Sequence, residues 1–432
     1  MPHSRPSRPR NLNQLVDPYP RYATLREAGR VVRITTSSAG EAALVTRYED
    51  AAALAGDTRL STDSAHASPD VRRRLEAGKF RVLDAWPDNM LVLDPPRHTR
   101  LRRLVARHFT ARRVESLRPF VRESVGELVD ALPTRGHADL VRGLALPVPH
   151  RVVSRLLGVP AEDSPLLQRW LEQITLLPVD DAAVATVSRG REEMLAHLES
   201  LIAAKRRNPG DDLVSALLTG EADAERLTVP EIVSMAGLLF SAGTGTTVHM
   251  IGNGLQFLLR YPAHLSALAA DPSLVEPAVE ELLRLESPIT LGLLRYAACD
   301  LSVGETVIPK GDLVIVGVAT ANHDHRRFSP ADEMDLSRQD RSHLAFGKGP
   351  HYCIGAPLAR LELGEVFGTL VGRYPRMRLA VPAEDLVWGG GDAARTRGAA
   401  RPAEAGTARR ADASPVTAFP RRRARCARAP RR

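Results

Sequence analysis

A single cysteine lies within a glycine-rich segment near the end of the chain. Residues 346–360 read Phe-Gly-Lys-Gly-Pro-His-Tyr-Cys-Ile-Gly-Ala-Pro-Leu-Ala-Arg, with Cys353 in the middle. The pattern predicts a tight loop over 347–350 and a helix over about 357–371. A thiol just before a helix meets backbone N–H groups and the positive end of the helix dipole, which both favour the thiolate. Gly355 lets the backbone approach a flat group closely. We therefore expect one exposed, ionised sulfur that serves as a lone axial ligand.

Zinc binding by Cys353 and a purely structural role for it both explain less of the segment than axial ligation does. A zinc site needs further Cys or His ligands nearby, and this region does not supply them at ligand spacing. A lone cysteine is usually a buried structural residue, but that role does not account for the whole surrounding pattern. Cys299 and Cys426 are far away in sequence, so we expect no disulfide framework and a cytoplasmic location.

The segment resembles the haem-ligating loop of the cytochrome P450 family, whose pattern Phe-Gly-x-Gly-x-His-x-Cys-x-Gly it matches at every fixed position. The resemblance covers nearly all of residues 11–388. It implies a mainly α fold with small β-sheets in one large domain. It also implies that haem b binds here, with Cys353 as the iron ligand and Phe346, Gly347, His351 and Gly355 around it.

A second group of residues resembles the structural and propionate-binding motifs of the same family. Glu281 and Arg284 resemble its Glu-x-x-Arg pair, and their i, i+3 spacing lets them form an ion pair behind the cysteine loop. The family often has a further Arg near Glu333-Met334, which this chain lacks there. The resemblance implies that the haem propionates contact His98, Arg102, Arg295, His343 and His351.

The segment over residues 239–247 resembles the oxygen-binding motif Ala-Gly-x-acid-Thr-Thr. The resemblance implies that Ala242 and Gly243 leave room over the iron and that Thr246, followed by Thr247, supplies the catalytic alcohol. Gly245 stands where the family usually has Asp or Glu. Glycine cannot relay a proton through a side chain, although it leaves space for water.

Three consequences of Gly245 remain open. Water or a substrate hydroxyl can carry the protons for oxygenation, which is the possibility we favour. The enzyme can instead perform different chemistry, namely oxidative coupling, peroxide use or nitric oxide reduction. The glycine can also be an impairing substitution.

Helical periodicity dominates the rest of the chain. Helices are predicted over 98–109, 114–132, 164–177, 186–204 and 273–286. Residues 228–231 form a capping box with an early proline, and the helix that follows can extend to residue 260, about 48 Å. Residues 232–259 lack charged side chains but contain many polar ones, which favours a helix buried in protein over a membrane span. Strands are predicted over 31–35 and 43–46, and a hairpin over 301–308 and 313–318.

The positive charge is concentrated at the end of the chain. The formal net charge is +8, and residues 389–432 hold twelve Arg and three acids, a net of +9, which leaves −1 for residues 1–388. A near-neutral body excludes a global field for nucleic acid. We expect residues 1–10 and the Ala/Arg-rich tail 389–432 to be disordered. A frameshift that replaced a native C-terminal strand pair is a further hypothesis for the tail. The N-terminus shows no apolar segment typical of a secretory signal or membrane anchor.

The resemblance implies a monomeric monooxygenase that hydroxylates or epoxidises a small molecule, with electrons from NAD(P)H through an acidic ferredoxin and its reductase. A basic patch for that ferredoxin is predicted at Arg100, Arg103, Arg107, Arg112, Arg113 and Lys348. Few aromatic residues in the predicted lining indicate a bulky aliphatic substrate of secondary metabolism. The predicted substrate contacts are Leu83, Met90, Leu238, Leu239, Ala242, Ile289, Leu291 and Leu293. A non-enzymatic haem protein that binds gases is the alternative class.

Overall fold

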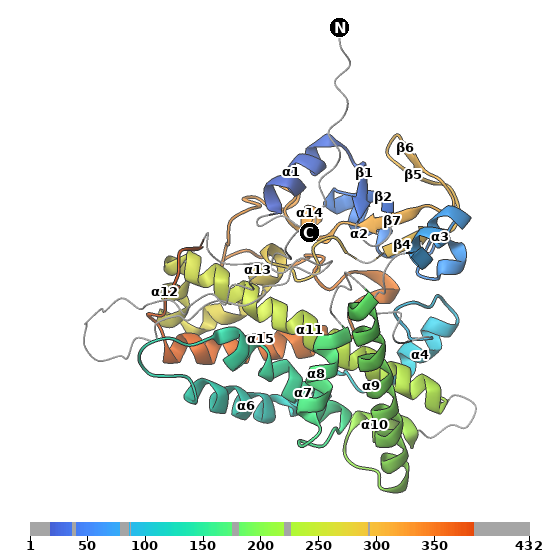
Figure 1. The fold of residues 1–432 in the computed structure, drawn as a ribbon. Coiled ribbons are helices and arrows are strands. Elements are labelled where there is room, and N and C mark those ends of the chain that lie inside the picture. The colour runs from blue at the N-terminus through green and yellow to red at the C-terminus, as the bar shows by residue number, and fades with distance from the viewer. Residues whose placement is uncertain are drawn as a thin grey trace, which may run out of the picture.

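Amphipathic helices and short strands assemble into a helical layer and a small sheet in the computed structural model (Figure 1). The structure describes residues 18–36, 40–77, 86, 88–174, 181–219, 226–292 and 294–383, so the predicted arm 1–10 and tail 389–432 lie outside it. The helices are α1 Tyr19–Ala28, α2 Tyr48–Leu54, α3 Pro69–Ala77, α4 Arg97–Ala106, α5 Ala111–Ser116, α6 Arg118–Asp130, α7 Pro147–Leu157, α8 Ser164–Ile174, α9 Asp181–Arg207, α10 Leu213–Leu218, α11 Val229–Arg260, α12 Pro262–Ala270, α13 Val275–Leu285, α14 Val318–Asn322 and α15 Ala356–Arg373.

The main sheet joins strands from both ends of the described chain. Its order is β1-β2-β7-β4-β3, and only the β2–β7 pair is parallel. Side chains alternate across it, since Leu44 and Ile315 enter one hydrophobic cluster while Val45 and Val314 enter another. The strands are β1 Val31–Thr36, β2 Gly40–Val45, β3 Leu60–Ser61, β4 Leu294–Ala297, β5 Leu301–Val303, β6 Thr306–Ile308 and β7 Leu313–Val316.

The predicted hairpin over 301–308 and 313–318 is wrong. β5 and β6 pair with each other instead, because Gly304 adopts a φ of 59° and turns the chain between them. β7 is therefore free to enter the main sheet, where it pairs with β2 and β4. This arrangement places the end of β7 beside the cavity described below, which Val316 and Val318 line.

The long helix α11 crosses the molecule between the sheet and the helices α6–α10 (Figure 1). It begins with the predicted capping box, in which Thr228 accepts from Glu231 N and the Glu231 side chain accepts from Thr228 N. Most of its side chains are buried in the largest hydrophobic cluster. Glycines let neighbours approach it closely, because a Cβ on Gly254 would lie 2.5 Å from the Phe367 ring of α15. α11 and α15 thus form two walls of one site.

The predicted helix over 114–132 is two helices, α5 and α6, that meet at Leu117. Pro119 explains the break, because proline lacks an N–H and is tolerated only in the first turn of a helix. The helices predicted over 98–109, 186–204 and 357–371 are confirmed as α4, α9 and α15, with ends that differ by a few residues.

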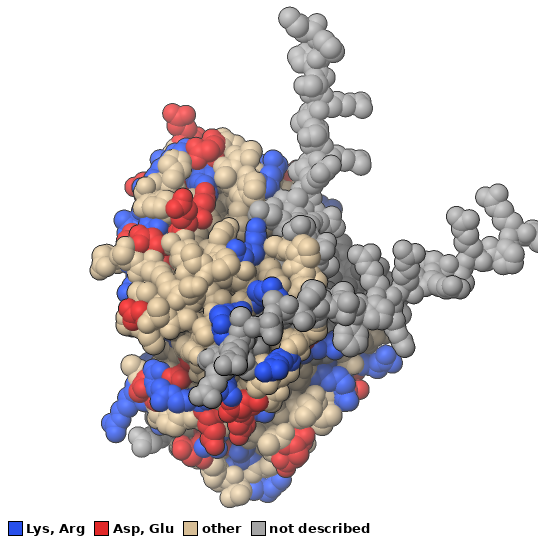
Figure 2. Space-filling model, turned by 90° about the vertical axis from the view of Figure 1, so that its left-hand side faces the viewer, with Lys and Arg blue, Asp and Glu red and all other residues tan. Residues whose placement is uncertain are grey.

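Acidic and basic side chains both occur across the face shown in Figure 2, and neither sign covers it alone. This mixture agrees with the near-neutral charge of residues 1–388. Over the part of the chain that the structure describes, no helix combines the length and apolarity needed to cross a bilayer.

Candidate functional site

The cysteine loop is held in place by its backbone and by α15. Cys353 N donates to Phe346 O at 2.8 Å, which closes the loop over the intervening residues. Gly347 and Gly349 take φ values of 70° and 75°, which favour glycine. A Cβ on Gly349 would also lie 2.5 Å from Gly56 Cα, so no other residue fits at position 349 without movement. The Cys353 sulfur is therefore fixed at the start of α15.

The Cys353 thiol is exposed to a cavity and enclosed by protein elsewhere. Burial raises the pKa of the Cys353 thiol. Backbone hydrogen bonds from Gly355 and Ala356 and the charges of Arg102 and Arg360 lower that pKa, but burial is the larger effect. The sequence-based expectation of a lowered pKa is thus wrong for the protein without a bound cation, because burial outweighs the helix terminus. The two N–H groups remain directed at the sulfur, where they stabilise a ligating thiolate.

The cavity above Cys353 has a volume of about 280 Å³ and walls that are mostly apolar. The predicted contacts Met90, Leu238, Leu239, Ala242 and Ile289 line it, and so do residues that sequence reasoning missed: Phe109, Val153, Leu156, Met250, Val316 and Glu362. The predicted substrate contact of Leu291 is wrong, because this residue does not line the cavity. It packs in the hydrophobic cluster beside the sheet with Tyr296 and Ile315. Leu83 and Leu293 lie outside the described residues.

The predicted oxygen-binding residues lie on α11 beside the cavity. Ala242, Gly243, Thr246 and Thr247 line it, and the Thr246 hydroxyl donates to Ala242 O at 2.6 Å. Gly245 does not line the cavity, and a Cβ built on it would meet nothing within 4 Å. The protein therefore has room for the acid that the motif usually carries, and the glycine is not required by packing.

Four nitrogen-rich side chains gather beside the cysteine loop, and none of them bonds a carboxylate of the described chain. Arg102, Arg295 and His351 line the cavity, and the rings of His98 and His351 lie 4.2 Å apart. Burial and Arg295 lower the pKa of His351 to about 3, and burial lowers the pKa of Arg295 to about 10. Both ring nitrogens of His98 are buried without a partner in the described chain. Buried donors that lack a carboxylate fit a ligand that brings its own, as the propionates of a bound haem would.

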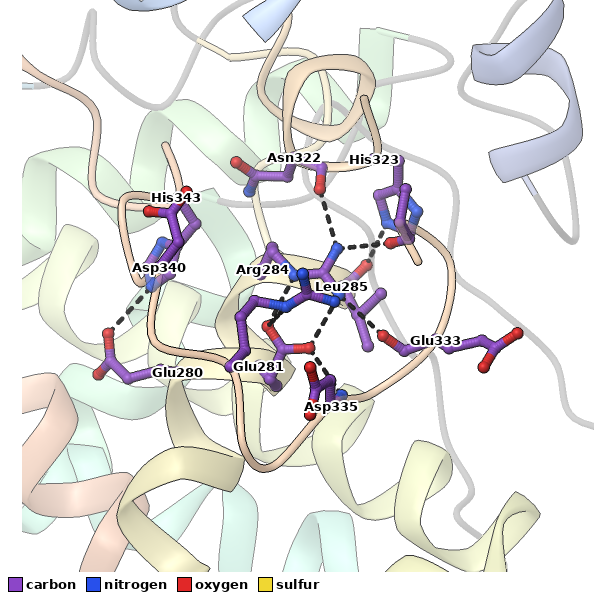
Figure 3. Close-up of polar contacts among 12 residues, drawn as sticks. Glu280, Glu281, Arg284, Leu285, Asn322, His323, Glu333, Asp335, Asp340 and His343 are labelled. Carbon is purple, nitrogen blue, oxygen red and sulfur yellow. Dashed lines mark hydrogen bonds and ion pairs between the residues drawn. The ribbon is translucent and has the colours of Figure 1, made fainter. Parts of the chain in front are cut away.

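The structure corrects the predicted propionate contact of His343. Its Nε2 lies 3.1 Å from Glu280 Oε2 and its Nδ1 accepts from Ala345 N, so both ring nitrogens are engaged outside the cavity (Figure 3). Glu280 also bonds Arg360, whose guanidinium lies 4.6 Å over the Phe346 ring. His343 therefore belongs to a network that connects α13 to the cysteine loop.

The Glu281–Arg284 pair is confirmed, and its third member is Arg338. Arg284 bonds both carboxylate oxygens of Glu281, at 2.7 and 2.9 Å, and donates to the carbonyls of Asn322, Ala331 and Glu333 (Figure 3). Arg338 Nε lies 3.1 Å from Glu281 Oε1 and its side chain is 8% exposed. The carboxylate thus binds two arginines, and the second comes from a residue slightly later than the position usual in the family.

Five of the six side chains of the predicted basic patch are exposed, and Arg100 is the exception. Arg103 of α4, Arg107 just after it, Arg112 and Arg113 of α5, and Lys348 of the loop are exposed. Arg100 instead bonds Glu231 at 2.7 Å, at the start of α11. Arg107 donates to His108 at 3.1 Å and keeps its charge.

Comparison with known proteins agrees with this geometry. A family model described as Cytochrome P450 matches residues 180–376. Cytochrome P450 monooxygenase PikC of Streptomyces venezuelae is 44% identical over 86% of this chain and 87% of its own. Mycinamicin IV hydroxylase/epoxidase of Micromonospora griseorubida is 38% identical over 86% of this chain and 91% of its own. The structure of the tirandamycin C-bound P450 monooxygenase TamI has a TM-score of 0.80 at 40% identity and covers 90% of this chain and 97% of that chain.

The described residues contain no cluster of three or more His, Cys, Asp or Glu side chains that could hold a metal ion. This chain belongs to the cytochrome P450 family. The relatives show it, and the cysteine loop, the apolar cavity and the nitrogen-rich side chains beside the loop agree with it.

Proposed function

We propose that the protein hydroxylates or epoxidises a bulky, mostly aliphatic small molecule. The observation that carries this proposal is the position of Cys353 at the base of an apolar cavity that Thr246 also lines. Haem supplies the oxidation chemistry when bound, with a thiolate ligand that favours O–O cleavage.

The chain's own residues bind the haem, orient the substrate and exclude water. Cys353 holds the iron, while Arg102, Arg295, His98 and His351 hold the propionates. Thr246 keeps a hydroxyl at the cavity wall, where it can donate or accept a proton. The aliphatic side chains above it bind substrate and displace water, which protects the reaction from unproductive proton leakage.

The cavity wall supports an uncharged, largely aliphatic substrate. On the side of α11 and α7, the lining includes Leu238, Leu239, Val153 and Leu156, and no charged side chain comes from these helices. The similarity to a mycinamicin IV hydroxylase/epoxidase and to a tirandamycin C-bound monooxygenase supports a natural product of comparable bulk. A screen for substrate-induced spin-state changes tests this class. Binding of small aromatic ligands alone would contradict it.

We propose that an acidic ferredoxin, supplied with electrons from NAD(P)H by a reductase, docks beside the cysteine loop. Lys348, Arg112 and Arg113 are exposed on this side and offer complementary charge. Reversal of the Arg112 charge by Arg112→Glu should slow reduction by the ferredoxin and leave substrate binding unchanged, because Arg112 does not line the cavity. Equal reduction rates at low and high salt would argue against an electrostatic docking surface.

Open space at Gly245 favours one alternative, a haem-thiolate enzyme with different chemistry such as oxidative coupling, peroxide use or nitric oxide reduction. Product formation with ferredoxin, reductase and NADPH separates the alternatives. Hydroxylated or epoxidised product supports oxygenation, coupled product supports the alternative, and no product with any ligand that binds would favour a gas-binding protein.

A further inference from the structure

Arg360 of α15 lies against the cysteine loop, although the function described so far gives it no role. Its Cζ atom lies 4.6 Å from the centroid of the Phe346 ring, a cation–π contact. Phe346 O in turn accepts from Cys353 N at 2.8 Å. Burial raises the pKa of Cys353, and the charge of Arg360 is one of the influences that lower it. The guanidinium therefore favours negative charge on the sulfur.

Glu280 of α13 holds Arg360 in this position. The Arg360 Nε and Nη2 atoms donate to the two carboxylate oxygens of Glu280 at 2.7 and 3.0 Å, a bidentate pair that fixes the plane of the guanidinium. Glu280 is 7% exposed and also contacts His343 (Figure 3). Burial raises the pKa of Glu280, but the bonds from His343 and Arg360 outweigh burial and lower it to about 2. A full negative charge is thus fixed beside the positive charge that contacts the loop.

The pair acts on a bound haem through space and not through substrate, because neither Arg360 nor Glu280 lines the cavity. Reduction of the haem adds one electron, which the ferredoxin proposed above supplies, and hence one negative charge to the iron–thiolate unit. A fixed positive charge nearby favours that added charge, and a fixed negative charge opposes it. The Arg360 side chain is 34% exposed, so solvent screens its charge only in part.

We propose that Arg360 and Glu280 set the reduction potential of the haem with opposite signs. Arg360 is the cation that raises the potential from the surface of the loop. Glu280 is the anion that holds Arg360 there and offsets part of its charge. The proposal rests on the haem–thiolate site proposed above and is independent of the substrate. Both residues act from outside the cavity, as positioning and charge-setting groups.

Redox titration of the substrate-free, haem-loaded protein measures both effects. Arg360→Met should lower the ratio of ferrous to ferric haem at a fixed potential at least about threefold, ~28 mV for a one-electron couple, and Glu280→Gln should raise it by a similar factor. The double variant should return close to the wild type, because both charges are removed together. Glu365→Gln is the matched control and should leave the potential unchanged. Glu365 is also a buried, ion-paired glutamate, but its partners are Arg118 and Arg122 of α6.

The double variant separates an effect of charge from an effect of packing. Loss of packing would shift Arg360→Met and Glu280→Gln in the same direction, and the double variant would then deviate at least as far as either. That pattern, or a Glu280→Gln protein whose potential does not rise, would overturn the proposal. Arg360→Lys keeps the charge, so its potential should lie closer to the wild type than that of Arg360→Met.

Two further measurements keep the test decisive. If Arg360→Met does not retain haem, the direction of the Glu280→Gln shift still supports or refutes the assignment. The spectrum of the reduced protein with carbon monoxide separates the two levels of failure. A wild type without the red-shifted band would refute the haem–thiolate site itself. A normal band in all variants with unchanged potentials would refute only the roles of Arg360 and Glu280.

Discussion

Removal of the Arg284 guanidinium is predicted to destabilise the protein more than removal of any exposed arginine. Arg284 is 1% exposed and makes two hydrogen bonds to Glu281 and three to backbone carbonyls. Arg284→Met would leave those carbonyls without their donor and leave Glu281 with Arg338 as its remaining cation.

The magnitude follows from the burial of the pair. Loss of one partner of a buried ion pair costs about 3–5 kcal/mol, a large share of the roughly 5–15 kcal/mol that stabilises a typical domain. Arg338→Met should cost less, roughly 1–2 kcal/mol, because Glu281 keeps both bonds from Arg284. Arg73→Met is the matched control, since Arg73 pairs with Asp70 on the surface at 74% exposure and should matter by less than about 0.5 kcal/mol.

Urea unfolding of the haem-loaded variants, followed by far-UV circular dichroism and by haem absorbance, measures these costs. The predicted order of destabilisation is Arg284→Met, then Arg338→Met, then Arg73→Met. An Arg284→Met protein within about 1 kcal/mol of the wild type would refute the reasoning, because the network would then contribute no more than a surface pair.

Three further predictions concern pH, haem retention and packing. Burial raises the pKa of Glu280, but hydrogen bonds from His343 and Arg360 outweigh burial and hold the pKa at about 2. This carboxylate therefore stabilises the fold above pH 4.5, and its contribution is lost as the pH falls toward 2. Glu280→Gln should reduce the loss of stability at acid pH in urea-unfolding experiments, and an unchanged acid dependence would contradict the assignment. Arg295→Met should speed haem transfer to apomyoglobin about tenfold or more, since a hydrogen bond to a charged group contributes about 1.5–3 kcal/mol, whereas an unchanged rate would remove Arg295 from the propionate site. Gly237→Ala should lower the free energy of unfolding by about 1–3 kcal/mol and alter tryptophan fluorescence, because its Cβ would lie 2.2 Å from the Trp86 ring, which donates to Ser241. Gly245→Ala is the control, since its Cβ would meet no atom within 4 Å, and it should be neutral or stabilising in unfolding experiments.

Local pattern was enough to predict the cysteine loop, the long helix and the Glu281–Arg284 pair. Each depends on residues close in sequence, such as the capping box at Thr228 or the i, i+3 spacing on α13. The third member of the Glu281 network could not be predicted, for a physical reason. Arg338 reaches Glu281 because Arg284 holds the carbonyls of Ala331 and Glu333 and thereby shapes the loop, a contact that no short pattern contains.

Other parts of the site depend on burial and on distant packing. His343 looked like a propionate ligand from its place before the loop, but Glu280 of α13 binds its ring. Glu362 was not predicted because one acid in an amphipathic helix gives no sign of facing inward until α11 covers it. Leu291 packs in the hydrophobic cluster beside the sheet, a contact that depends on distant residues such as Ile315.

The proposed function depends most on Cys353 as the thiolate ligand of haem iron. The most direct measurement is the absorption spectrum of the reduced, haem-loaded protein with carbon monoxide, in the wild type and in Cys353→His. We predict the red-shifted band that gives the family its name in the wild type and its disappearance in the variant. A wild type without that band, or a variant that keeps it, would contradict the assignment.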